Sequence, residues 1–376
     1  MVQVVVTGIG IVSALGQSLQ SNWENLLAGK TGIKLHQPFP ELGLIPLGLI
    51  GEKPTDLINL TQMAITSALE DGEISPPLPD CAVVIGSSRS QQAAWEKLAR
   101  KDLNLETWLN TLPHIHAIAA ARKIGSTGTV LAPMAACATG VWAIAQAVML
   151  IQTGQYQRVI AGAVEAPITP LSIAGFRQMG ALAQTGAYPF DIHREGLVLG
   201  EGAAIFILET LELAQKRQAK IYGEILSFGL TADAYHPNQP DPNSKGAIAA
   251  IQQCLQRSQL KPSDIDYIHA HGTATQLNDH IESLIIQQLF PPQISISSTK
   301  GATGHTLGAS AALGIAFSLL ALQQKTLPPN VGLTQPEFDL NFVTTSSTKQ
   351  INQILCFSFG FGGQNAVLAL RNINFA

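Results

Sequence analysis

Two long stretches of this chain, residues 138–152 and 309–324, are apolar on nearly every side of the helix that each predicts. A surface helix carries one apolar stripe and one polar face, whereas a helix that is apolar all round is buried on every side. Two such helices in one chain require covering layers on both sides. The pattern therefore predicts a pair of central helices between two sheets.

Short β-branched runs alternate with the predicted helices, at residues 2–6, 81–85, 159–163, 265–271 and 353–359. Continuous apolar strands that alternate with helices indicate an α/β fold with buried sheets. Both parts of the chain repeat a strand, a polar or glycine-rich turn and a long apolar helix. Because the polar stretch 216–220 separates the repeats, we expect two halves, 1–215 and 216–376.

Charged residues make up only 13% of the chain, and the net charge is −4. This excludes a nucleic-acid binder of the electrostatic kind, and it requires burial of much surface within the chain or against a partner subunit. The N-terminus lacks the features of a signal peptide. The longest apolar run, 311–322, is shorter than the ~20 residues needed to span a bilayer. We therefore expect a soluble, cytoplasmic protein without a membrane span.

Four cysteines, at positions 81, 137, 254 and 356, form no CxxC pair, which indicates free thiols. Cys137 lies between a predicted strand and the start of the first central helix. The free N–H groups and the positive dipole end of a helix start favour a thiolate. Cys137 is therefore a candidate nucleophile, with a buried structural cysteine as the alternative. The other three cysteines fall within predicted strands or helices.

A second candidate, His271, stands where a strand ends and a polar loop begins, the usual exit for catalytic groups in parallel sheets. His269 and His271 form an alternative metal pair. No third ligand follows at a useful spacing, apart from Asp279 and His280. We therefore expect no metal ion.

Further candidates surround two glycine-rich segments. Lys300 and His305 flank a turn before the second central helix, and a lysine in so weakly charged a segment requires a partner. A phosphate-binding loop is the alternative reading of this turn, but the GxxxxGK[ST] pattern is absent. Residues 358–363 combine three glycines with two aromatic rings, which suits either a tight turn between strands or a flexible gate beside a pocket.

A thiol, two histidines and a lysine together suit acyl transfer through a thioester. Attack requires a thiolate, and a later enolate requires hydrogen-bond donors at its developing oxyanion. Neutral histidines can supply those donors without quenching the thiolate.

On these residues the chain resembles the elongating β-ketoacyl-acyl-carrier-protein synthases, of types I and II, in the thiolase-like superfamily. The resemblance covers nearly the whole chain, and its motifs occur in family order. It implies a five-layer αβαβα fold of two similar halves, a homodimer, and an acyl carrier protein whose phosphopantetheine carries the substrates, with no other cofactor. The motifs are Ala136-Cys137-Ala138 with Gly140, Pro189-Phe-Asp-x-x-Arg-x-Gly196, Gly200-Glu-Gly202, His271-Gly-Thr-Ala-Thr275, Lys300-x-x-x-x-His305 and Gly360-Phe-Gly-Gly363.

The resemblance also implies a reaction, the decarboxylative condensation of an acyl-Cys137 thioester with malonyl carrier protein in fatty acid biosynthesis. His271 and His305 would assist decarboxylation and stabilise the enolate. Lys300 would act electrostatically, with Glu282 as its charge partner.

Other roles come from the same resemblance. The backbone N–H groups of the nucleophile and of Phe361 would form the oxyanion hole, and the Phe361 ring would be a gate, with Phe359 beside it. Thr273 and Thr275 would contact the pantetheine arm. Arg194 is the first choice for docking an acidic carrier protein, ahead of Arg177, Lys123 and Arg122.

Departures from the family pattern leave alternatives open. The chain is shortened between residues 34 and 120, and Ser87–Ser90 replaces a glycine-rich segment. A ketosynthase of a specialised lipid or polyketide pathway is the main alternative. A non-catalytic chain-length partner would lack the cysteine. A degradative thiolase would need a second active-site cysteine, and Cys356 is out of register for that role.

Overall fold

The computed structural model describes residues 2–373, in which ten strands form one continuous sheet of order β10-β9-β13-β14-β8-β1-β7-β6-β4-β5. The strands are β1 (Val4–Ser13), β4 (Ala82–Gly86), β5 (Val130–Leu131), β6 (Arg158–Glu165), β7 (Gly202–Thr210), β8 (Gly223–Ala232), β9 (Tyr267–His269), β10 (Ser295–Ser297), β13 (Gln353–Gly360) and β14 (Gln364–Arg371).

Each half of the sheet has the same internal order. We number the five strands of each half in chain order. From the outer edge of the sheet to its centre, they then lie in the order third, second, fourth, fifth and first in both halves. The pairing directions repeat as well: the third, second and fourth strands are parallel neighbours, and the remaining neighbours are antiparallel. Three residue pairs between β1 and β8 join the halves.

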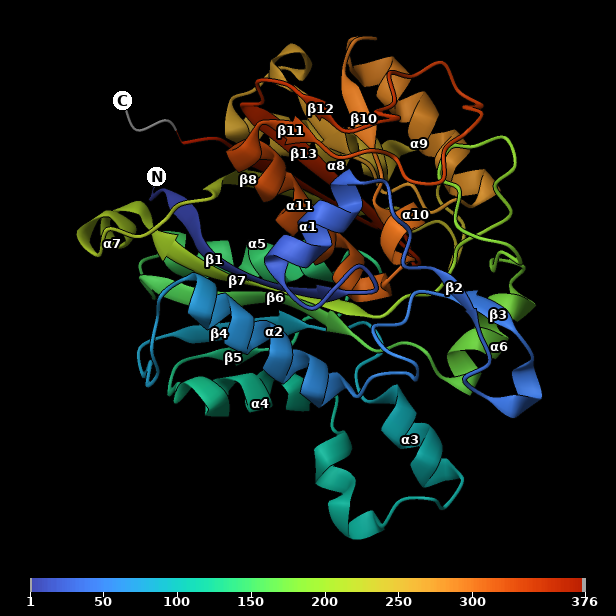
Figure 1. Ribbon diagram of the computed structural model, residues 1–376. Helices are drawn as coiled ribbons and strands as arrows, with labels where there is room; N and C mark the ends of the chain where they lie inside the picture. Colours follow the sequence, from blue (N-terminus) through green and yellow to red (C-terminus); the bar gives the residue numbers. More distant parts are fainter. Residues whose placement is uncertain (1, 374–376) are drawn as a thin grey trace.

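Helices α5 (Thr139–Gln152) and α11 (Ser310–Gln324) lie side by side between the two halves of the sheet and contact strands of both (Figure 1). Helices α2 (Leu57–Asp71) and α4 (Ile115–Ile124) cover the outer face of the N-terminal half, and α8 (Lys245–Ser258) and α9 (Gln276–Leu289) that of the C-terminal half (Figure 1). The arrangement confirms the expected layered α/β fold with two central helices.

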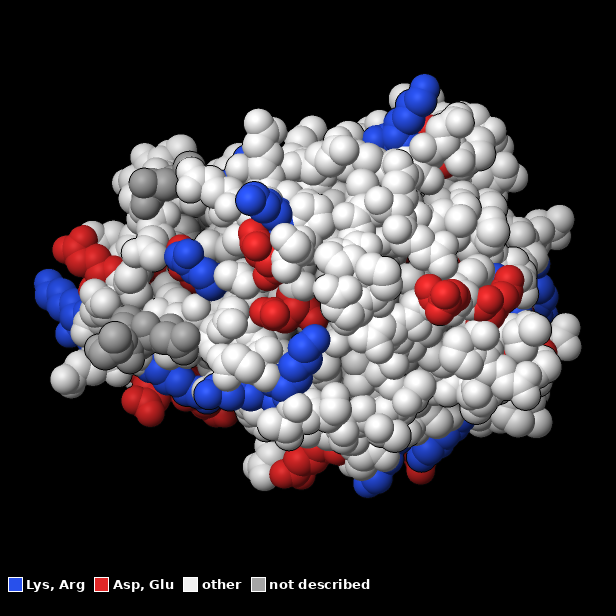
Figure 2. Space-filling view, turned by 90° about the horizontal axis from the view of Figure 1, so that it is seen from above, with Lys and Arg blue, Asp and Glu red and all other residues white. Residues whose placement is uncertain are grey.

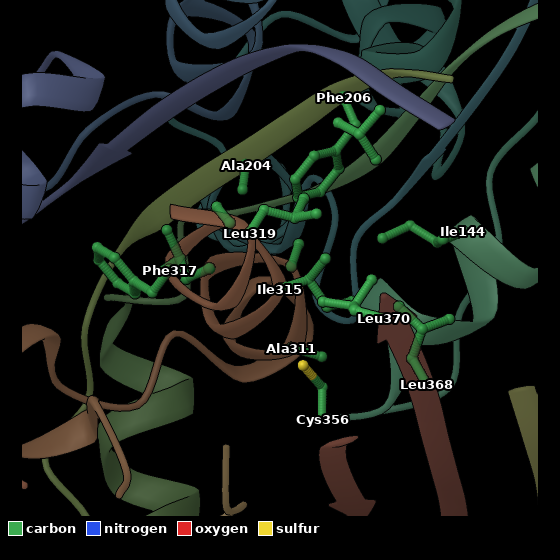
Figure 3. Close-up of a cluster of buried hydrophobic side chains, with 14 of the residues drawn as sticks. Ile144, Ala204, Phe206, Ala311, Ile315, Phe317, Leu319, Cys356, Leu368 and Leu370 are labelled. Atoms are coloured by element: carbon green, nitrogen blue, oxygen red, sulfur yellow. The ribbon is translucent and has the colours of Figure 1, made fainter. Parts of the chain in front are cut away.

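The core around α11 shows why its sequence is apolar all round. Every residue from 310 to 322 is buried. Figure 3 shows side chains of α11 meeting those of α5 and of strands from both halves; the labelled ones are Ile144, Ala204, Phe206, Ala311, Ile315, Phe317, Leu319, Cys356, Leu368 and Leu370. The helix α11 therefore belongs to a core that the two halves of the sheet share.

The helical stretch that contains the apolar run 311–322 is longer than the run itself. A 3-10 turn, η4 (Leu307–Ala309), runs directly into α11, so the helical stretch Leu307–Gln324 has 18 residues and is long and apolar enough to cross a membrane. However, 89% of the stretch is buried inside the protein. Packing between the two sheet halves therefore accounts for its composition.

The remaining elements lie around this framework. A projecting arm, formed by α3 (Gln92–Ala99) and η2 (Leu105–Thr111), extends from the body (Figure 1) and exposes Trp95, Leu105, Trp108 and Leu109. The others are α1 (Leu19–Leu27), β2 (Lys34–His36), η1 (Pro40–Leu42), β3 (Ile45–Leu47), α6 (Pro170–Gln178), α7 (Leu211–Lys216), η3 (Pro262–Asp264), α10 (Lys300–Thr303), β11 (Thr326–Leu327) and β12 (Ser347–Thr348).

Candidate active site

A cavity of about 330 Å³ lies where the ends of strands from both halves meet the starts of the central helices. Cys137, His271, His305 and Phe361 all line it. The Cys137 sulfur and one ring nitrogen of each histidine lie within 4.8 Å of one another. The structure therefore brings together residues that the sequence places far apart.

Cys137 sits on a strained turn just before α5. The preceding residue, Ala136, has a φ of +48°, a left-handed conformation that L-residues with a side chain rarely adopt. Thr139 holds the turn: its hydroxyl accepts the Ala135 N–H at 2.9 Å and donates to the Ala136 carbonyl at 2.7 Å. From β13, the Ser358 hydroxyl donates to the Cys137 carbonyl at 2.9 Å. Such strain persists only where the surroundings enforce it, and functional sites are where it gathers.

The electrostatics of Cys137 differ from the sequence expectation. Burial raises the pKa of its thiol to about 11, while the positive charge of Lys300 and the backbone N–H of Phe361 lower it. The helix start alone therefore does not make a thiolate in the free protein. Burial also raises the pKa values of the other three cysteines, to about 12. Among residues 2–373, Cys137 is the only cysteine that lines this cavity.

His305 is held in one tautomer. Its Nδ1 accepts the backbone N–H of Leu307 at 3.1 Å, and the Ser310 hydroxyl lies 2.9 Å from the same nitrogen. The ring proton must then be on Nε2. Burial, and secondarily the charge of Lys300, hold the pKa of His305 well below its usual value. The ring is therefore neutral at pH 7 and has one N–H to donate.

His271 and Lys300 form a second buried pair. The Lys300 ammonium donates to the His271 backbone carbonyl, and Nζ lies 3.4 Å from His271 Nδ1. Burial lowers the pKa of His271 strongly, with Lys300 and His305 adding to the effect. The two histidine rings meet edge to face, 5.5 Å apart between centroids. Both rings are thus neutral groups beside one fixed positive charge.

Glu282 does not form the expected ion pair with Lys300 and supports the site in another way. Its carboxylate accepts the backbone N–H groups of His271 at 2.6 Å and Gly272 at 2.8 Å, and no ion pair joins it to Lys300 among residues 2–373. Burial lowers the pKa of Lys300, and the negative charge of Glu282 opposes that fall through space. Glu282 therefore fixes the loop after β9, and its charge balances Lys300 without contact.

Asp279 is a loop anchor that the sequence reasoning considered only as a metal ligand. Its buried carboxylate accepts the N–H groups of Phe190 at 2.8 Å and Ala274 at 3.2 Å. The available signal was its spacing, since residues three apart on a helix share a face, and Asp279 lies one turn before Glu282.

The end of β13 lies directly across the nucleophile. A Cβ on Gly360 would stand 3.1 Å from the Cys137 nitrogen, so a side chain there would crowd this approach. The ring of Phe361 stacks on Phe176 at 6.1 Å, and Phe359 meets the edge of His271 at 6.0 Å. Phe176 and Phe361 belong to or pack against an apolar cluster that includes Ile173, Leu197, Leu199 and Leu307, and Leu197 lines the cavity together with Cys137.

Thr273 and Thr275 lie along another wall of the cavity, with their hydroxyl oxygens 2.8 Å apart. The loop residues Asn238, Gln239 and Pro240 also line it.

The docking role expected for Arg194 is wrong. Its side chain is 1% exposed, pairs with Glu337, donates to the Asp191 carbonyl at 2.9 Å and lies over the Phe338 ring at 5.0 Å. A residue so enclosed has no surface to offer a partner. Arg194 instead ties the 189–196 loop to the segment near 337.

The alternative metal pair of His269 and His271 does not form. The ring of His269 packs against Gly314 of α11, and its Nε2 lies 3.1 Å from the Thr299 hydroxyl. Within residues 2–373, the three potential ligand atoms that lie close together belong instead to Cys137, His271 and His305. Lys300, at 3.4 Å from His271 Nδ1, opposes a cation there. That the site works without a metal stays a prediction.

Comparisons with known proteins agree with this geometry. The family model "Beta-ketoacyl synthase, N-terminal domain" matches residues 1–44 and 54–214, and "Beta-ketoacyl synthase, C-terminal domain" matches residues 222–334. The 3-oxoacyl-[acyl-carrier-protein] synthase 2 of Coxiella burnetii is 33% identical over 99% of both chains. The mitochondrial 3-oxoacyl-[acyl-carrier-protein] synthase of Arabidopsis thaliana is 33% identical over 99% of this chain and 93% of its own.

Solved structures show the same likeness. A chain of the AntDE:AntF complex, a type II polyketide acyl-carrier protein with its ketosynthase bound to a hexaketide, superposes with a TM-score of 0.94 at 28% identity, covering 99% of this chain and 100% of its own. A beta-ketoacyl synthase from Burkholderia phymatum gives 0.90 at 27% identity over the full length of both chains. The chain belongs to the β-ketoacyl synthase family and is an acyltransferase of the 3-oxoacyl-[acyl-carrier-protein] synthase kind.

Proposed function

We propose that this synthase loads an acyl group onto Cys137 and extends it by two carbons from a malonyl carrier thioester, in fatty acid biosynthesis. The observation that carries the proposal is the meeting of the Cys137 sulfur with His271 and His305 in one cavity, beside the charge of Lys300. A nucleophile and two neutral donors at one point suit both halves of a condensation.

The first step is loading. The Cys137 sulfur attacks the thioester carbonyl of the acyl carrier while its thiol proton passes to the departing pantetheine sulfur; the carbon–sulfur bond to pantetheine breaks, and the carrier leaves as a thiol. The N–H groups of Cys137 and Phe361 hold the oxyanion. The backbone N–H of Phe361 lowers the pKa of the Cys137 thiol, so it lies near the sulfur, where the new carbonyl forms.

The second step is condensation. The malonyl carboxylate leaves as carbon dioxide, and the enolate oxygen takes hydrogen bonds from His271 and from His305 Nε2. The enolate carbon then attacks the acyl carbonyl, and the bond to Cys137 breaks to return the thiolate. The product is a β-ketoacyl carrier thioester. The fixed tautomer of His305 suits this role, because its donor is in place before the charge develops.

The acyl chain enters beside the stacked rings. The Phe361 ring stacks on Phe176 and packs against the apolar cluster that contains Leu197 and Leu199. Gly362 and Gly363, at φ of +79° and +72°, give the segment after Phe361 freedom to turn. We assign Phe361 as the gate, and Thr273 and Thr275 as contacts for the pantetheine arm.

A different arginine is the candidate for carrier docking once Arg194 is excluded. Arg177 is exposed on α6, next to Phe176 and two residues before Met179, which line the cavity. On the face shown in Figure 2, charged side chains of both signs are scattered among uncharged ones. Arg177→Glu should raise the KM for carrier-bound substrate and spare small pantetheine thioesters. Arg122→Glu, on α4, is the matched control, and equal losses for both substrate types would reject the assignment.

A homodimer, acting in the cytoplasm, completes the proposal. The projecting arm exposes Trp95, Leu105, Trp108 and Leu109, which need a cover. Obligate interfaces supply one. Light scattering should give twice the 39.9 kDa of the chain, and Trp108→Glu should shift the protein toward monomer. A wild-type chain that scatters as a monomer would reject this part.

A polyketide or specialised-lipid pathway is the second candidate. The solved neighbours at TM-scores of 0.94 and 0.92 are a polyketide ketosynthase complex and the ishigamide ketosynthase/chain length factor. Product masses from saturated acyl carriers and from β-ketoacyl carriers, each with malonyl carrier, distinguish the two. Extension of saturated acyl groups only supports fatty acid synthesis, and repeated extension of β-keto groups supports the second candidate.

A further inference from the structure

Glu165, the last residue of β6, is fully buried beneath the active site and accepts hydrogen bonds from two separate loops. From the loop after β4 come the Ser87 hydroxyl (2.8 Å), the Ser88 N–H and hydroxyl (2.7 and 2.6 Å) and the Arg89 N–H (2.9 Å). From the start of the second central helix comes the Gly308 N–H (3.0 Å). One carboxylate thus ties the N-terminal half to the turn that directly follows His305.

The contact with Gly308 leaves no room for a side chain. A Cβ at that position would stand 2.6 Å from Glu165 Oε2 and 2.9 Å from the Ser88 nitrogen. Leu307, directly before it, has a φ of +42°, which is unfavourable for a residue with a bulky side chain. The strained pair 307–308 therefore depends on the hydrogen bond to Glu165 for its conformation.

That conformation in turn aims the N–H of Leu307 at His305. The N–H donates to Nδ1 at 3.1 Å, and this bond fixes the ring proton on Nε2. If residues 307–308 relaxed, Nδ1 would lose this donor, and a proton could move to Nδ1, where the Ser310 hydroxyl, 2.9 Å away, would accept its hydrogen bond. The ring would then present a bare Nε2 to the cavity, which cannot donate a hydrogen bond.

We propose that Glu165 is a positioning residue: by holding Gly308 and Leu307, it keeps His305 in the tautomer that donates from Nε2. This effect of Glu165 on the His305 tautomer does not depend on which reaction the protein catalyses. Only its consequence, stabilisation of the enolate, rests on the proposed function.

The charge of Glu165 has a second, separable effect. It raises the pKa of the Cys137 thiol, as burial does, whereas Lys300 and Arg89 lower it; the neutral rings of His271 and His305 are the other titratable neighbours. Removing the charge should therefore speed alkylation of Cys137 while it slows decarboxylation. A general loss of structure would also lower the pH midpoint of alkylation, because it removes the burial that raises the thiol pKa, but it would do so for Cys81, Cys254 and Cys356 as well as for Cys137.

The test uses Glu165→Gln, with Glu209→Gln as matched control. Glu209 is also fully buried on a strand, but it accepts hydrogen bonds from Thr7, Arg158 and Arg217, whereas Glu165 accepts one from Gly308. In Glu165→Gln, the 15N signals of His305, assigned by their loss in His305→Ala, should change from the pure Nε2–H pattern to a mixture. Malonyl decarboxylation should fall at least about ten-fold, and the pH midpoint of iodoacetamide labelling of Cys137 should move down. Glu209→Gln should change none of these.

A second variant separates the effect of Glu165 on the His305 tautomer from the effect of its charge on Cys137. It also keeps the proposal testable if Glu165→Gln does not fold. Gly308→Ala pushes residue 308 off the carboxylate but leaves the charge, so the tautomer should become mixed while the labelling midpoint does not move down. A pure Nε2–H pattern in Gly308→Ala, or in a folded Glu165→Gln, would overturn the proposal. A wild-type protein with the pure pattern but no condensation on any carrier would instead reject the proposed function and leave the hold intact.

Discussion

Gly140→Ala tests how closely the two central helices must approach for catalysis. The new Cβ would stand 2.6 Å from the Ala312 nitrogen, 3.1 Å from the Ala312 Cβ and 3.2 Å from the Ala311 Cβ. Ordinary contacts begin near 3.4 Å, so α5 and α11 must separate by about 0.8 Å at this point. The helices carry Cys137 and His305 at their starts, and the separation therefore acts on both reacting groups.

Two terms set the change in stability. Forcing an extra carbon into a packed core costs roughly 1–3 kcal/mol, and replacing glycine by alanine inside a helix returns about 1 kcal/mol. Gly140→Ala should therefore lower the free energy of unfolding by about 0–2 kcal/mol. The rate should suffer more, because a misplacement of roughly 1 Å can cost about 100-fold.

The matched control is Gly175→Ala. Gly175 also lies inside a helix, α6, but a Cβ there meets no atom within 4 Å. It should gain about 1 kcal/mol from helix propensity alone. Denaturant unfolding and condensation rates of both variants make the comparison. If Gly140→Ala is as stable and as active as Gly175→Ala, the helix crossing does not limit the site and the reasoning fails.

Three further outcomes are expected. Iodoacetamide should label Cys137 before the other cysteines, because it alone among residues 2–373 lines the cavity and its thiol has the lowest raised pKa; peptide mapping that finds another site first contradicts the assignment. His271→Ala and His305→Ala should each lower decarboxylation by ~10²–10³-fold and acyl loading far less, and equal losses in the two assays would refute the enolate role. The pKa values of both histidines are held well below 6.5, so their ring NMR signals should not titrate as pH falls from about 7.5 to about 6; a titration midpoint near 6.5 in the signals of either ring would contradict this.

Sequence reasoning located the parts of the site that depend on local pattern. The apolar helices predict their own burial, and Cys137, His271 and His305 each follow a strand or begin a helix, where functional groups commonly stand. The fold brings these positions to one cavity. Side-chain environments were harder to foresee, because they depend on partners far along the chain. Arg194 is enclosed by Glu337, 143 residues away, and its sequence neighbours give no sign of this.

Glu165 shows the same limit. A glutamate at the end of a strand is expected at the surface, since a buried carboxylate is costly without partners. Its partners come from residues 87–89 and 308, which no local pattern connects to it. Glu282 was found through the resemblance, but its contacts are with backbone N–H groups, and these cannot be read from side-chain types.

The repeated strand order places the nucleophile and one histidine at equivalent points of two related units. Cys137 precedes α5 and His305 precedes α11, and each helix connects the third strand of its half to the fourth. Two identical units would place either two thiols or two imidazoles in the site. Neither pair would supply both a thiol that carries the acyl group and an imidazole that stabilises the enolate. The reaction therefore requires different residues at the two equivalent points, although the two halves share one fold. Substitution of the residue at one of these two points could therefore abolish catalysis while the fold is retained.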